Sequence, residues 1–527
     1  MLKWATPCCA VILLLLLPRG GARAADEIHW TFTGQTSVSF DWRGSAAEDF
    51  IRYGTTSGSY TDTVVAQTPT PLPYSSAGPF FEARLTGLTE DTLYFYSIAD
   101  GPEHTFRTPP PRGESGFTVY VEADIGDTTN YSPMVPVQEL IAAGQPEFVL
   151  APGDLTYANA NGQDAVDQHF NDVMVWSRDA AYMPAWGNHE WDDNGGNDDL
   201  RNYKGRFDLP NPQTSPGSPP ISCCGEDWYW FDYGNVRFIA YPEPWAGAWD
   251  DWAVQADALM DQAELDPDIG FIVTVGHQPP YSSGHHPSVA GIASILDTLG
   301  AEHLKYVLNL NGHSHNYERT WPQNGVVHLT TGTGGGTLQT DGSCLWNTCV
   351  QPEWSAFRAF RYGAVRLDFS SEAIDGAFIC GPPSSRDDID CIEGEVVDTF
   401  QIGTTAPPNG TIDAPIGDVE IDVGQTVTFE GTGSDPDGDP ALRYLWDFNG
   451  VAPESTEEDP GAILFRHVRR LHDGLHGDRQ YGPIGPDPRS PHGRGTRARR
   501  HARRAIEPGT VGGRRRGEGH GPDSAGQ

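Results

Sequence analysis

Long apolar runs and basic side chains are both scarce in this sequence. Past the first 24 residues no run of about 20 apolar residues occurs, so nothing there is long enough to span a bilayer as a helix. The 527 residues include 34 Lys and Arg against 72 Asp and Glu, which gives a formal net charge of −38. This acidic excess argues against nucleic acid or an anionic membrane as a partner and favours a soluble extracellular protein.

Cysteine is sparse too, and the N-terminus points to an oxidising compartment. Lys3, an apolar core at residues 10–17 and a small-residue cleavage site at 22–24 predict a signal peptide over residues 1–24. We therefore expect a secreted protein, extracellular or periplasmic. Of the eight cysteines, six follow that segment, an even number that predicts disulfides. The pairs that close short loops are Cys344 with Cys349 and Cys380 with Cys391. Cys223 and Cys224 remain as an adjacent pair, for which a strained vicinal disulfide is an open alternative.

Five short blocks in the middle of the chain carry residue types that bind metal ions. The blocks span residues 123–127, 153–157, 187–190, 275–277 and 312–319. Four of them come directly after a β-branched or aromatic run that predicts a buried strand, at 117–121, 148–150, 271–275 and 306–310. We expect the blocks to project from loops at one edge of a sheet, where open α/β folds place their sites.

Seven side chains in these blocks offer the oxygen and nitrogen donors needed to hold two metal ions side by side. They are Asp124, Asp154, Tyr157, Asn188, His277, His313 and His315. A lone Asp or His in a loop is usually an exposed surface residue. Several such donors in order along the chain rarely arise by chance, so we interpret the set as a binuclear metal site.

The five blocks resemble those of the calcineurin-like metallophosphoesterases. Tyr157, three residues after Asp154, narrows the resemblance to the purple acid phosphatases. The resemblance covers residues 28–405. The chain departs from the family at Ala123, because the family usually has Gly before its first aspartate, but the extra methyl group removes no ligand.

This resemblance implies a centre of Fe(III) and a divalent ion, which would be Zn, Fe or Mn. The implied iron ligands are Asp124, Tyr157 and His315, the implied ligands of the divalent ion are Asn188, His277 and His313, and Asp154 bridges the two. The resemblance also implies that His189 binds phosphate or donates a proton to the leaving group, and that His286 and His285 contact the substrate phosphate. A metal-bound hydroxide would then attack phosphorus.

Other residues near the blocks give weaker indications. Asp127 and Glu190 are expected to orient ligands, whereas bracing of the fold explains Glu318 and Arg319 at least as well as substrate contact does. The three glycines at 334–336 lack the Lys and helix start of a phosphate-binding loop and predict a tight turn near the site. The acidic residues after the third block suit solvated surface better than a third metal site. They are Asp192, Asp193, Asp198 and Asp199.

Ahead of the blocks, short alternating runs over residues 28–108 predict a small β-sandwich. Residues 84–88, followed by Tyr94 and Tyr96, resemble a fibronectin type III module, which larger purple acid phosphatases carry before the catalytic domain. We assign residues 25–110 to this module, without a catalytic role. We place the catalytic domain at 111–405, where strand-like runs alternate with helical stretches. The predicted fold class is α/β: a layered metallophosphoesterase β-sandwich flanked by helices, preceded by the all-β domain.

The C-terminal part divides into two further segments. Residues 423–448 resemble the first half of a PKD-type module, and we assign 406–460 to this partial module, with surface or polysaccharide attachment as its expected role. Its aspartates suit calcium, although a plain turn is the commoner interpretation. Residues 461–527 lack hydrophobic periodicity and carry fourteen Arg from Arg466 onward, which predicts a basic disordered tail. A reading-frame shift in the gene explains this tail, and a genuine polyanion-binding tail is the rival.

The resulting hypothesis is a secreted binuclear-metal acid phosphatase that acts on small phosphate monoesters. A phosphodiesterase or nucleotide-active relative is one rival, because the same metal core serves both reactions. An exported binding protein with an inactive phosphatase-like domain is another, and the intact ligand set argues against it.

Overall fold

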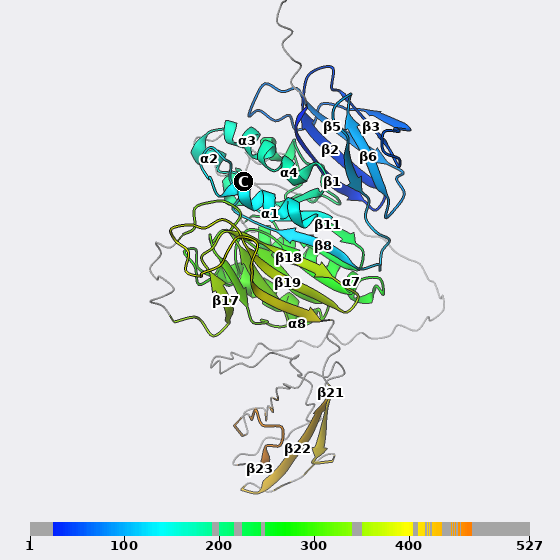
Figure 1. Ribbon diagram of the computed structural model, residues 1–527. Helices are drawn as coiled ribbons and strands as arrows, with labels where there is room; N and C mark the ends of the chain where they lie inside the picture. The colour runs from blue at the N-terminus through cyan, green and yellow to red at the C-terminus, as the bar shows by residue number, and fades with distance from the viewer. Residues whose placement is uncertain are drawn as a thin grey trace, which may run out of the picture. The chain divides into compact units, whose positions relative to one another are not determined.

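The computed structural model describes residues 25–191, 200–215, 224–243, 248–339, 350–403 and, with short gaps, 409–465. The expected signal peptide, the acidic residues after the third block, Cys223, Cys344, Cys349 and the basic tail lie outside these residues. Along the described chain an all-β domain comes first, a domain of two sheets and several helices follows, and a small sheet comes last (Figure 1). No helix in the described ranges combines the length and the apolar character needed to cross a membrane.

The N-terminal domain is a sandwich of two sheets with the strand orders β1-β2-β5 and β4-β3-β6-β7. Its strands are β1 (Asp26–Gly34), β2 (Ser37–Arg43), β3 (Phe50–Gly54), β4 (Asp62–Val65), β5 (Phe80–Thr86), β6 (Leu93–Ile98) and β7 (His104–Arg107). Trp30 of β1 meets Phe106 of β7 across the sandwich, with ring centroids 5.8 Å apart. Burial of such aromatic faces holds the two sheets together, and the all-β domain predicted from the alternating pattern is confirmed.

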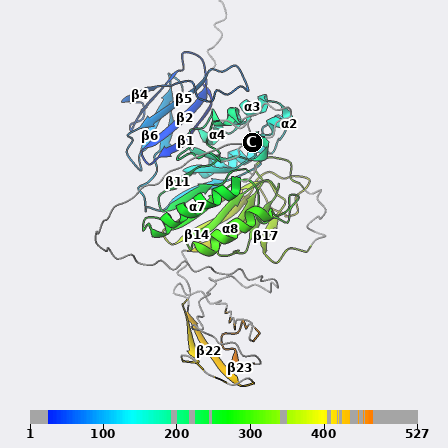
Figure 2. The same ribbon diagram turned by 180° about the vertical axis from the view of Figure 1, so that it is seen from behind.

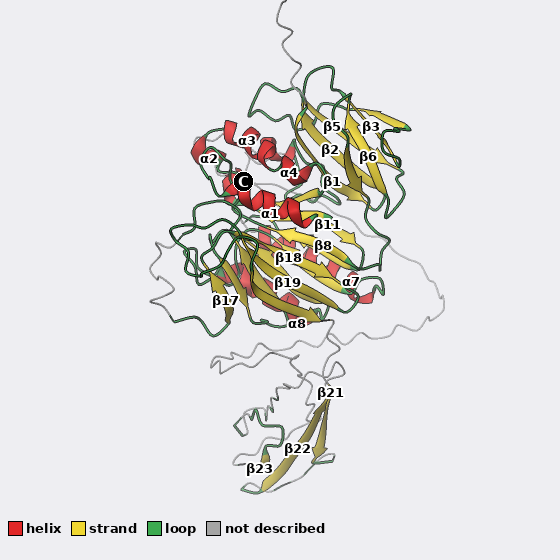
Figure 3. Ribbon diagram, viewed as in Figure 1, coloured by secondary structure: helices red, strands yellow, loops and turns green. Residues whose placement is uncertain are grey.

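The second domain contains two mixed sheets packed face to face (Figure 3). The six-stranded sheet has the order β10 (Ala181–Ala185), β9 (Phe148–Pro152), β8 (Phe117–Val121), β18 (Gly363–Phe369), β19 (Ala373–Cys380) and β20 (Val396–Gly403). The seven-stranded sheet has the order β11 (Trp230–Tyr233), β12 (Val236–Ala240), β13 (Phe271–Val275), β14 (Tyr306–Asn311), β16 (Val327–Thr331), β15 (Tyr317–Thr320) and β17 (Ser355–Ala359). Phe238 of β12 contacts Phe148 of β9 and Phe369 of β18, at centroid distances of 5.5 and 5.9 Å. The inner faces of the sheets therefore share one core, and the predicted layered α/β fold is confirmed.

Helices flank these sheets. They are α1 (Met134–Gly144), α2 (Ala158–Asn161), α3 (Asp164–Asp172), α4 (Met174–Ser177), α5 (Asn188–Trp191), α6 (Arg201–Lys204), α7 (Ala248–Leu265) and α8 (Ala290–Glu302). α1 packs against β18 of the six-stranded sheet, and α7 and α8 lie side by side over the seven-stranded sheet (Figure 2). α7 buries Trp252, Ala256, Met260 and Ala263, a spacing of three and four residues that gives the helix one apolar face.

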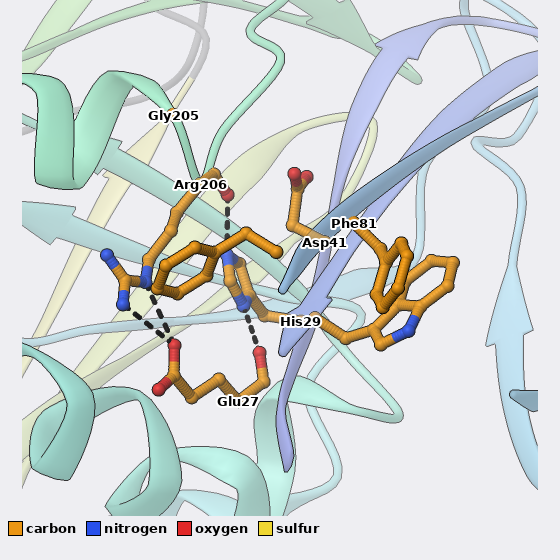
Figure 4. A pocket seen from close by; sticks show the side chains of 8 residues that line it. Glu27, His29, Asp41, Phe81, Gly205 and Arg206 are labelled. Atoms are coloured by element: carbon orange, nitrogen blue, oxygen red, sulfur yellow. Dashed lines mark hydrogen bonds and ion pairs between the residues drawn. The ribbon is translucent and has the colours of Figure 1, made fainter. Parts of the chain in front are cut away.

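A buried polar cluster joins the N-terminal sandwich to the second domain (Figure 4). We call Glu27, His29, Asp41 and Arg206 the interface cluster. The ring nitrogens of His29 lie 2.6 Å from the Glu27 carbonyl oxygen and 2.5 Å from that of Arg206. The Arg206 guanidinium pairs with the Glu27 carboxylate at 2.9 Å. Because Arg206 belongs to the second domain, these contacts fix β1 against that domain.

The C-terminal sheet has its own small core. β21 (Asn409–Ala414), β22 (Thr426–Ser434) and β23 (Gly461–Leu464) are antiparallel, and Phe429 and Phe448 are buried between them and the adjoining chain. β23 lies beyond residue 460, where we expected the folded module to end. Ile463 and Phe465 pack against this core, so the folded segment extends at least to Phe465. The resemblance to a PKD module stays a prediction.

The disulfide predicted between Cys380 and Cys391 is present. Cys224 is disulfide-bonded as well.

Candidate metal centre

The proposed metal ligands lie beyond the carboxyl ends of parallel strands, in loops or, for Asn188, at the first residue of α5. Asp124 follows β8, Asp154 follows β9 and Asn188 follows β10, while His277 follows β13 and His313 and His315 follow β14. Carboxyl ends of parallel strands meet at one edge of a sheet. Because the two sheets are packed face to face, the loops of both converge. The sequence predicted one sheet edge, whereas the site draws on two.

Three of these residues adopt a backbone conformation that residues other than Gly rarely show. The φ angle is +56° at Asp124, +50° at Asp154 and +67° at His313. Such conformations persist only where surrounding contacts hold them, and they concentrate at functional sites. The residue types alone did not predict these strained backbone conformations.

Asp124, Tyr157 and His315 form a first group of donors. Nε2 of His315 lies 3.1 Å from Oδ1 of Asp124 and 3.0 Å from the Tyr157 hydroxyl oxygen. The Nδ1–H of the same ring donates to the Thr337 carbonyl oxygen at 2.7 Å. A carbonyl oxygen can only accept a hydrogen bond, so the lone pair of Nε2 is the one that faces the other donors.

Asp154, Asn188, His277 and His313 form a second group. Nε2 of His277 lies 3.1 Å from Oδ2 of Asp154 and 3.2 Å from Oδ1 of Asn188. One ligand atom each from Asp154, His277 and His313 lie within 4.8 Å of one another. The Nδ1–H of His277 donates to the Pro152 carbonyl oxygen at 2.9 Å, which again turns Nε2 toward the donors. The structure thus brings all seven predicted residues together, in two groups.

Burial and charge act on the protonation of these groups in opposite directions. Burial disfavours the charged forms of His277 and Asp154, but their mutual attraction raises the pKa of His277 well above its usual value and lowers that of Asp154. Burial, with the nearby carboxylates of Asp124 and Asp154, raises the pKa of Tyr157 well above its usual value. Its hydroxyl therefore loses its proton to a base or to water only when a strong positive charge, such as that of a bound metal ion, stabilises the phenolate.

The donor set fits a pair of different ions. The first group offers a carboxylate, a phenol oxygen and one imidazole, which a hard ion prefers, and the second offers two imidazoles and an amide oxygen for a softer divalent ion. Asp154 has two oxygens: Oδ2 faces His277, and Oδ1 accepts a hydrogen bond from the His189 main-chain N–H at 2.9 Å.

Glycines allow the chain to pass close to the donors. A Cβ at Gly187 would lie 2.2 Å from Oδ1 of Asp154, and one at Gly336 would lie 2.7 Å from the Tyr157 hydroxyl oxygen. The Gly336 N–H donates to the Asp124 main-chain oxygen at 2.7 Å, so the glycine turn lies beside the site as predicted. The methyl group of Ala123 fits because its neighbour Gly312 has no side chain: a Cβ there would lie 2.5 Å away.

A cavity of about 390 Å³ opens onto both groups. Its lining includes Asp154, Tyr157, Asn188, His313 and His315, together with His189, His285 and His286. The Nδ1–H of His189 donates to the amide oxygen of Asn159 at 2.7 Å, and its Nε2 lies 3.9 Å from Oδ2 of Asp154. The ring of His286 lies against that of His313, with centroids 4.0 Å apart.

Two buried glutamates hold the loops in place. The carboxylate of Glu190 accepts hydrogen bonds from the main-chain N–H groups of Asp154 and Gly187 at 2.8 and 2.7 Å. The carboxylate of Glu318 accepts from the N–H and hydroxyl of Ser283 at 2.7 and 2.6 Å, which fixes the loop that carries His285 and His286. Arg319 pairs with Asp398 at 2.7 Å. Both members of the Glu318–Arg319 pair thus brace the fold.

Asp127 makes none of the ligand-orienting contacts that we expected of it in the described residues. Its Oδ1 accepts a hydrogen bond from the Thr129 N–H at 2.8 Å, within its own turn, so it shapes the loop after Asp124 without touching a proposed ligand in any described contact.

Several residues that line the cavity escaped the sequence interpretation. They are Tyr131, Ala160, Thr337, Gln339 and Arg386. None follows a predicted strand within a ligand block, and Arg386 comes long after the last block. The one sequence signal close to any of them is the glycine turn predicted at 334–336, which directly precedes Thr337.

Comparison with known proteins identifies the class. Residues 25–109 match the family described as purple acid phosphatase, N-terminal domain, and residues 117–317 match the family described as calcineurin-like phosphoesterase. The described chain therefore carries an N-terminal domain of the purple acid phosphatase type followed by a calcineurin-like phosphoesterase domain.

Individual relatives are distant. An uncharacterized protein of Mycobacterium tuberculosis is 27% identical over 363 residues, which cover 60% of this chain and 66% of that protein, just under two thirds of its length. A nucleotide pyrophosphatase/phosphodiesterase of Hordeum vulgare is 28% identical, with 53% of this chain and 83% of that protein covered. The structure of the purple acid phosphatase PPD1 from Lupinus luteus seeds shares the fold, with a TM-score of 0.55, 20% identity and coverage of 72% of this chain and 74% of that one.

Proposed function

We propose that this protein is an acid phosphatase that hydrolyses phosphate monoesters with a pair of metal ions, Fe(III) and one of Zn, Fe or Mn. One observation carries the proposal: members of both donor groups line a single cavity, and three further histidines line the same cavity. A phosphate dianion needs positive charge and hydrogen-bond donors on several sides, and this cavity can supply both.

The metal pair and the side chains would divide the chemistry between them. When bound, two such ions supply positive charge for the phosphoryl oxygens and lower the pKa of water. Asp124, Tyr157 and His315 would hold the first ion, and Asn188, His277 and His313 the second, with Asp154 between them.

His189 is placed to move a proton. Its Nδ1–H is held by Asn159, so Nε2 is the nitrogen that can carry a proton to the leaving oxygen. General acid catalysis of this kind typically contributes about 10²–10⁴-fold. His286 and His285 line the same cavity and can donate N–H groups to phosphate oxygens.

Metal analysis with a substrate screen tests the proposal. The purified protein should contain two metal ions per chain and should be violet or pink when oxidised, because phenolate bound to Fe(III) absorbs visible light. Tyr157→Phe should remove the colour and leave some metal bound. A colourless wild type with two divalent ions, unaltered by an oxidant, would contradict the iron assignment alone.

A phosphodiesterase is the second candidate, and the name of the barley relative favours it. The same metal pair can serve a diester, which carries one negative charge less. The rates with p-nitrophenyl phosphate and bis(p-nitrophenyl) phosphate separate the two candidates, and the monoester should be the better substrate. No hydrolysis of either by metal-loaded protein would favour an inactive, binding protein.

We also propose that the protein is exported through its N-terminal segment and that its C-terminal sheet serves surface or polysaccharide attachment. The acidic composition supports the first part. N-terminal sequencing of secreted protein should find Ala25 at the start, and a mature chain that begins at Met1 would contradict export by cleavage.

A further inference from the structure

Arg386 places a fixed positive charge beside the cavity. It lines the cavity together with Tyr131 and Gln339. Arg386 is exposed, whereas Asp124 and His277 are fully buried. Among the described residues that line the cavity, it is the only Lys or Arg. The guanidinium therefore lies toward the solvent side, where a leaving group would project.

A short closed loop presents this side chain. The disulfide between Cys380, the last residue of β19, and Cys391 closes the loop. Asp387 pairs with Arg361 at 2.5 Å, and Asp388 accepts a hydrogen bond from the Phe360 N–H at 2.8 Å. These two acidic neighbours are thus held by the segment that leads into β18, and Arg386 is the charged residue that the loop contributes to the cavity.

Arg386 is also tied to the segment that orients a proposed ligand. Its Nη1 donates a hydrogen bond to the Leu338 carbonyl oxygen. The preceding residue, Thr337, accepts the hydrogen bond from His315. A guanidinium has five N–H donors in a planar fork, so this anchor fixes its position while other donors remain for a ligand. Beside it, Oε1 of Gln339 is buried without a hydrogen-bond partner in the described chain.

We propose that Arg386 forms a second anion subsite, which binds a phosphate group next to the one that is cleaved. This inference rests on the proposed phosphatase function and specifies its substrate class: phosphate compounds whose leaving group is itself anionic, such as a nucleoside diphosphate. With ADP, water supplies an oxygen to the terminal phosphorus, the bond from that phosphorus to the bridging oxygen breaks, and AMP and inorganic phosphate leave. The phosphate that stays on AMP remains bound to Arg386 throughout.

Size and chemistry both suit this assignment. A cavity of about 390 Å³ falls within the range of about 300–1,000 Å³ typical of small-ligand sites, so it has space beyond one phosphate. Arginine binds phosphate through paired, charge-assisted hydrogen bonds. The proposed metal pair and the three histidines of the cavity would account for the cleaved phosphate, which leaves the guanidinium for a second one.

The test compares kcat/KM for ADP with kcat/KM for p-nitrophenyl phosphate, whose leaving group carries no phosphate. In Arg386→Ala the ratio of the two should fall about 10- to 100-fold, the usual effect of losing a hydrogen bond between charged groups. Most of the change should appear in the KM for ADP. Arg386→Lys keeps the charge without the planar fork and should lie between the two. Arg107→Ala is the matched control, because Arg107 pairs with Asp91 in the N-terminal domain, and its ratio should equal that of the wild type.

A binding measurement separates this inference from the proposed function. Calorimetry with a methylene-bridged ADP analogue and with inorganic phosphate needs no turnover. Arg386→Ala should weaken the analogue far more than phosphate. An unchanged ratio in an active variant, or equal weakening of both ligands, overturns the subsite. A wild type that hydrolyses neither substrate but binds the analogue through Arg386 overturns the phosphatase function and leaves the subsite standing.

Discussion

Two buried clusters of ionisable groups shift the pKa of an aspartate in opposite directions. In the metal centre, Asp154 faces His277 at 3.1 Å, and the nearby imidazoles lower its pKa against the effect of burial. In the interface cluster, neither oxygen of Asp41 has a hydrogen-bond partner among the described residues, and burial followed by Glu82 and Asp208 raises its pKa well above the usual value. Burial alone therefore makes a neutral acid, and facing donors make a candidate ion site.

The first prediction, with the largest expected effect, concerns a variant that neutralises the Asp154 carboxylate at the candidate metal centre. Asp154→Asn should release metal and lower turnover roughly 10³-fold or more, since even partners outside the ligand set typically cost 10–100-fold. Metal analysis and kcat on the same sample check it. Asp127→Asn is the control, because Asp127 bonds only within its own turn in the described contacts, and it should keep both ions. A fully metallated Asp154→Asn protein would show that Asp154 is no bridging ligand.

The second prediction separates the roles of two adjacent residues of the third block, Asn188 and His189. His189→Ala should lower kcat about 10²–10⁴-fold and keep its metal, because Nε2 of His189 lies 3.9 Å from Asp154 and its ring is held by Asn159. Asn188→Ala should instead deplete the divalent ion, because Oδ1 of Asn188 lies 3.2 Å from Nε2 of His277. Equal loss of metal in both variants would refute this division of roles.

The sequence predicted four of the strands that carry the proposed metal ligands, because each of these strands has a recognisable pattern of its own. β8, β9, β13 and β14 are runs rich in β-branched, aromatic and other apolar residues, which are typical of strands buried on both faces. β10 was not predicted, because Pro184 interrupts its pattern. Proline is tolerated there because β10 is the edge strand of its sheet.

The interface cluster and the position of Arg386 could not be predicted from the sequence, for a physical reason. Asp41 lies in an alternating run of β2, where a polar residue predicts a solvent-facing side chain. The second domain covers that face, as the hydrogen bond from the Thr31 hydroxyl to the Asp208 carbonyl oxygen at 2.8 Å shows. Arg386 reaches the cavity through a disulfide-closed loop. Neither kind of contact leaves a local pattern in the chain.

The third prediction concerns the interface cluster and has a smaller effect. Because the pKa of Asp41 is raised in the folded state, this carboxyl contributes stability that is present at low pH and is lost as pH rises toward the raised pKa. Burial also raises the pKa of Glu27, to about 7, so it acts in the same direction. Burial lowers the pKa of His29 to about 4, so this imidazole acts in the opposite direction up to about pH 6.5. The unfolding temperature of the wild type should therefore fall between about pH 6.5 and 8.

Asp41→Asn should flatten this fall by about 2–4 °C, the shift expected for about 1 kcal/mol. Differential scanning calorimetry across that range measures it. Asp62→Asn, at an exposed position of β4, is the matched control and should follow the wild type. An Asp41→Asn curve parallel to the wild type would mean that Asp41 is ionised in the folded protein.

The smallest effect is expected for removal of the C-terminal sheet, which contributes to neither cluster. A chain that ends at Gly403 should keep its metal and its specific activity, because the seven proposed ligands and Arg386 all precede that residue. It also retains β20 and with it Asp398, whose carboxylate accepts hydrogen bonds from Arg319 at 2.7 and 2.9 Å and from Tyr317 at 2.8 Å.

A chain that ends at Glu395 sharpens this last test, since it differs only by the loss of β20. Arg319, with 12% of its side chain exposed, would lose its carboxylate partner, and breaking a buried ion pair typically costs about 3–5 kcal/mol. The shorter chain should therefore fail to fold, as circular dichroism and metal content would reveal. If the chain ending at Gly403 held both ions but turned over much more slowly than the full chain, the C-terminal segment would take part in catalysis, and the assignment of the site to the two packed sheets would be incomplete.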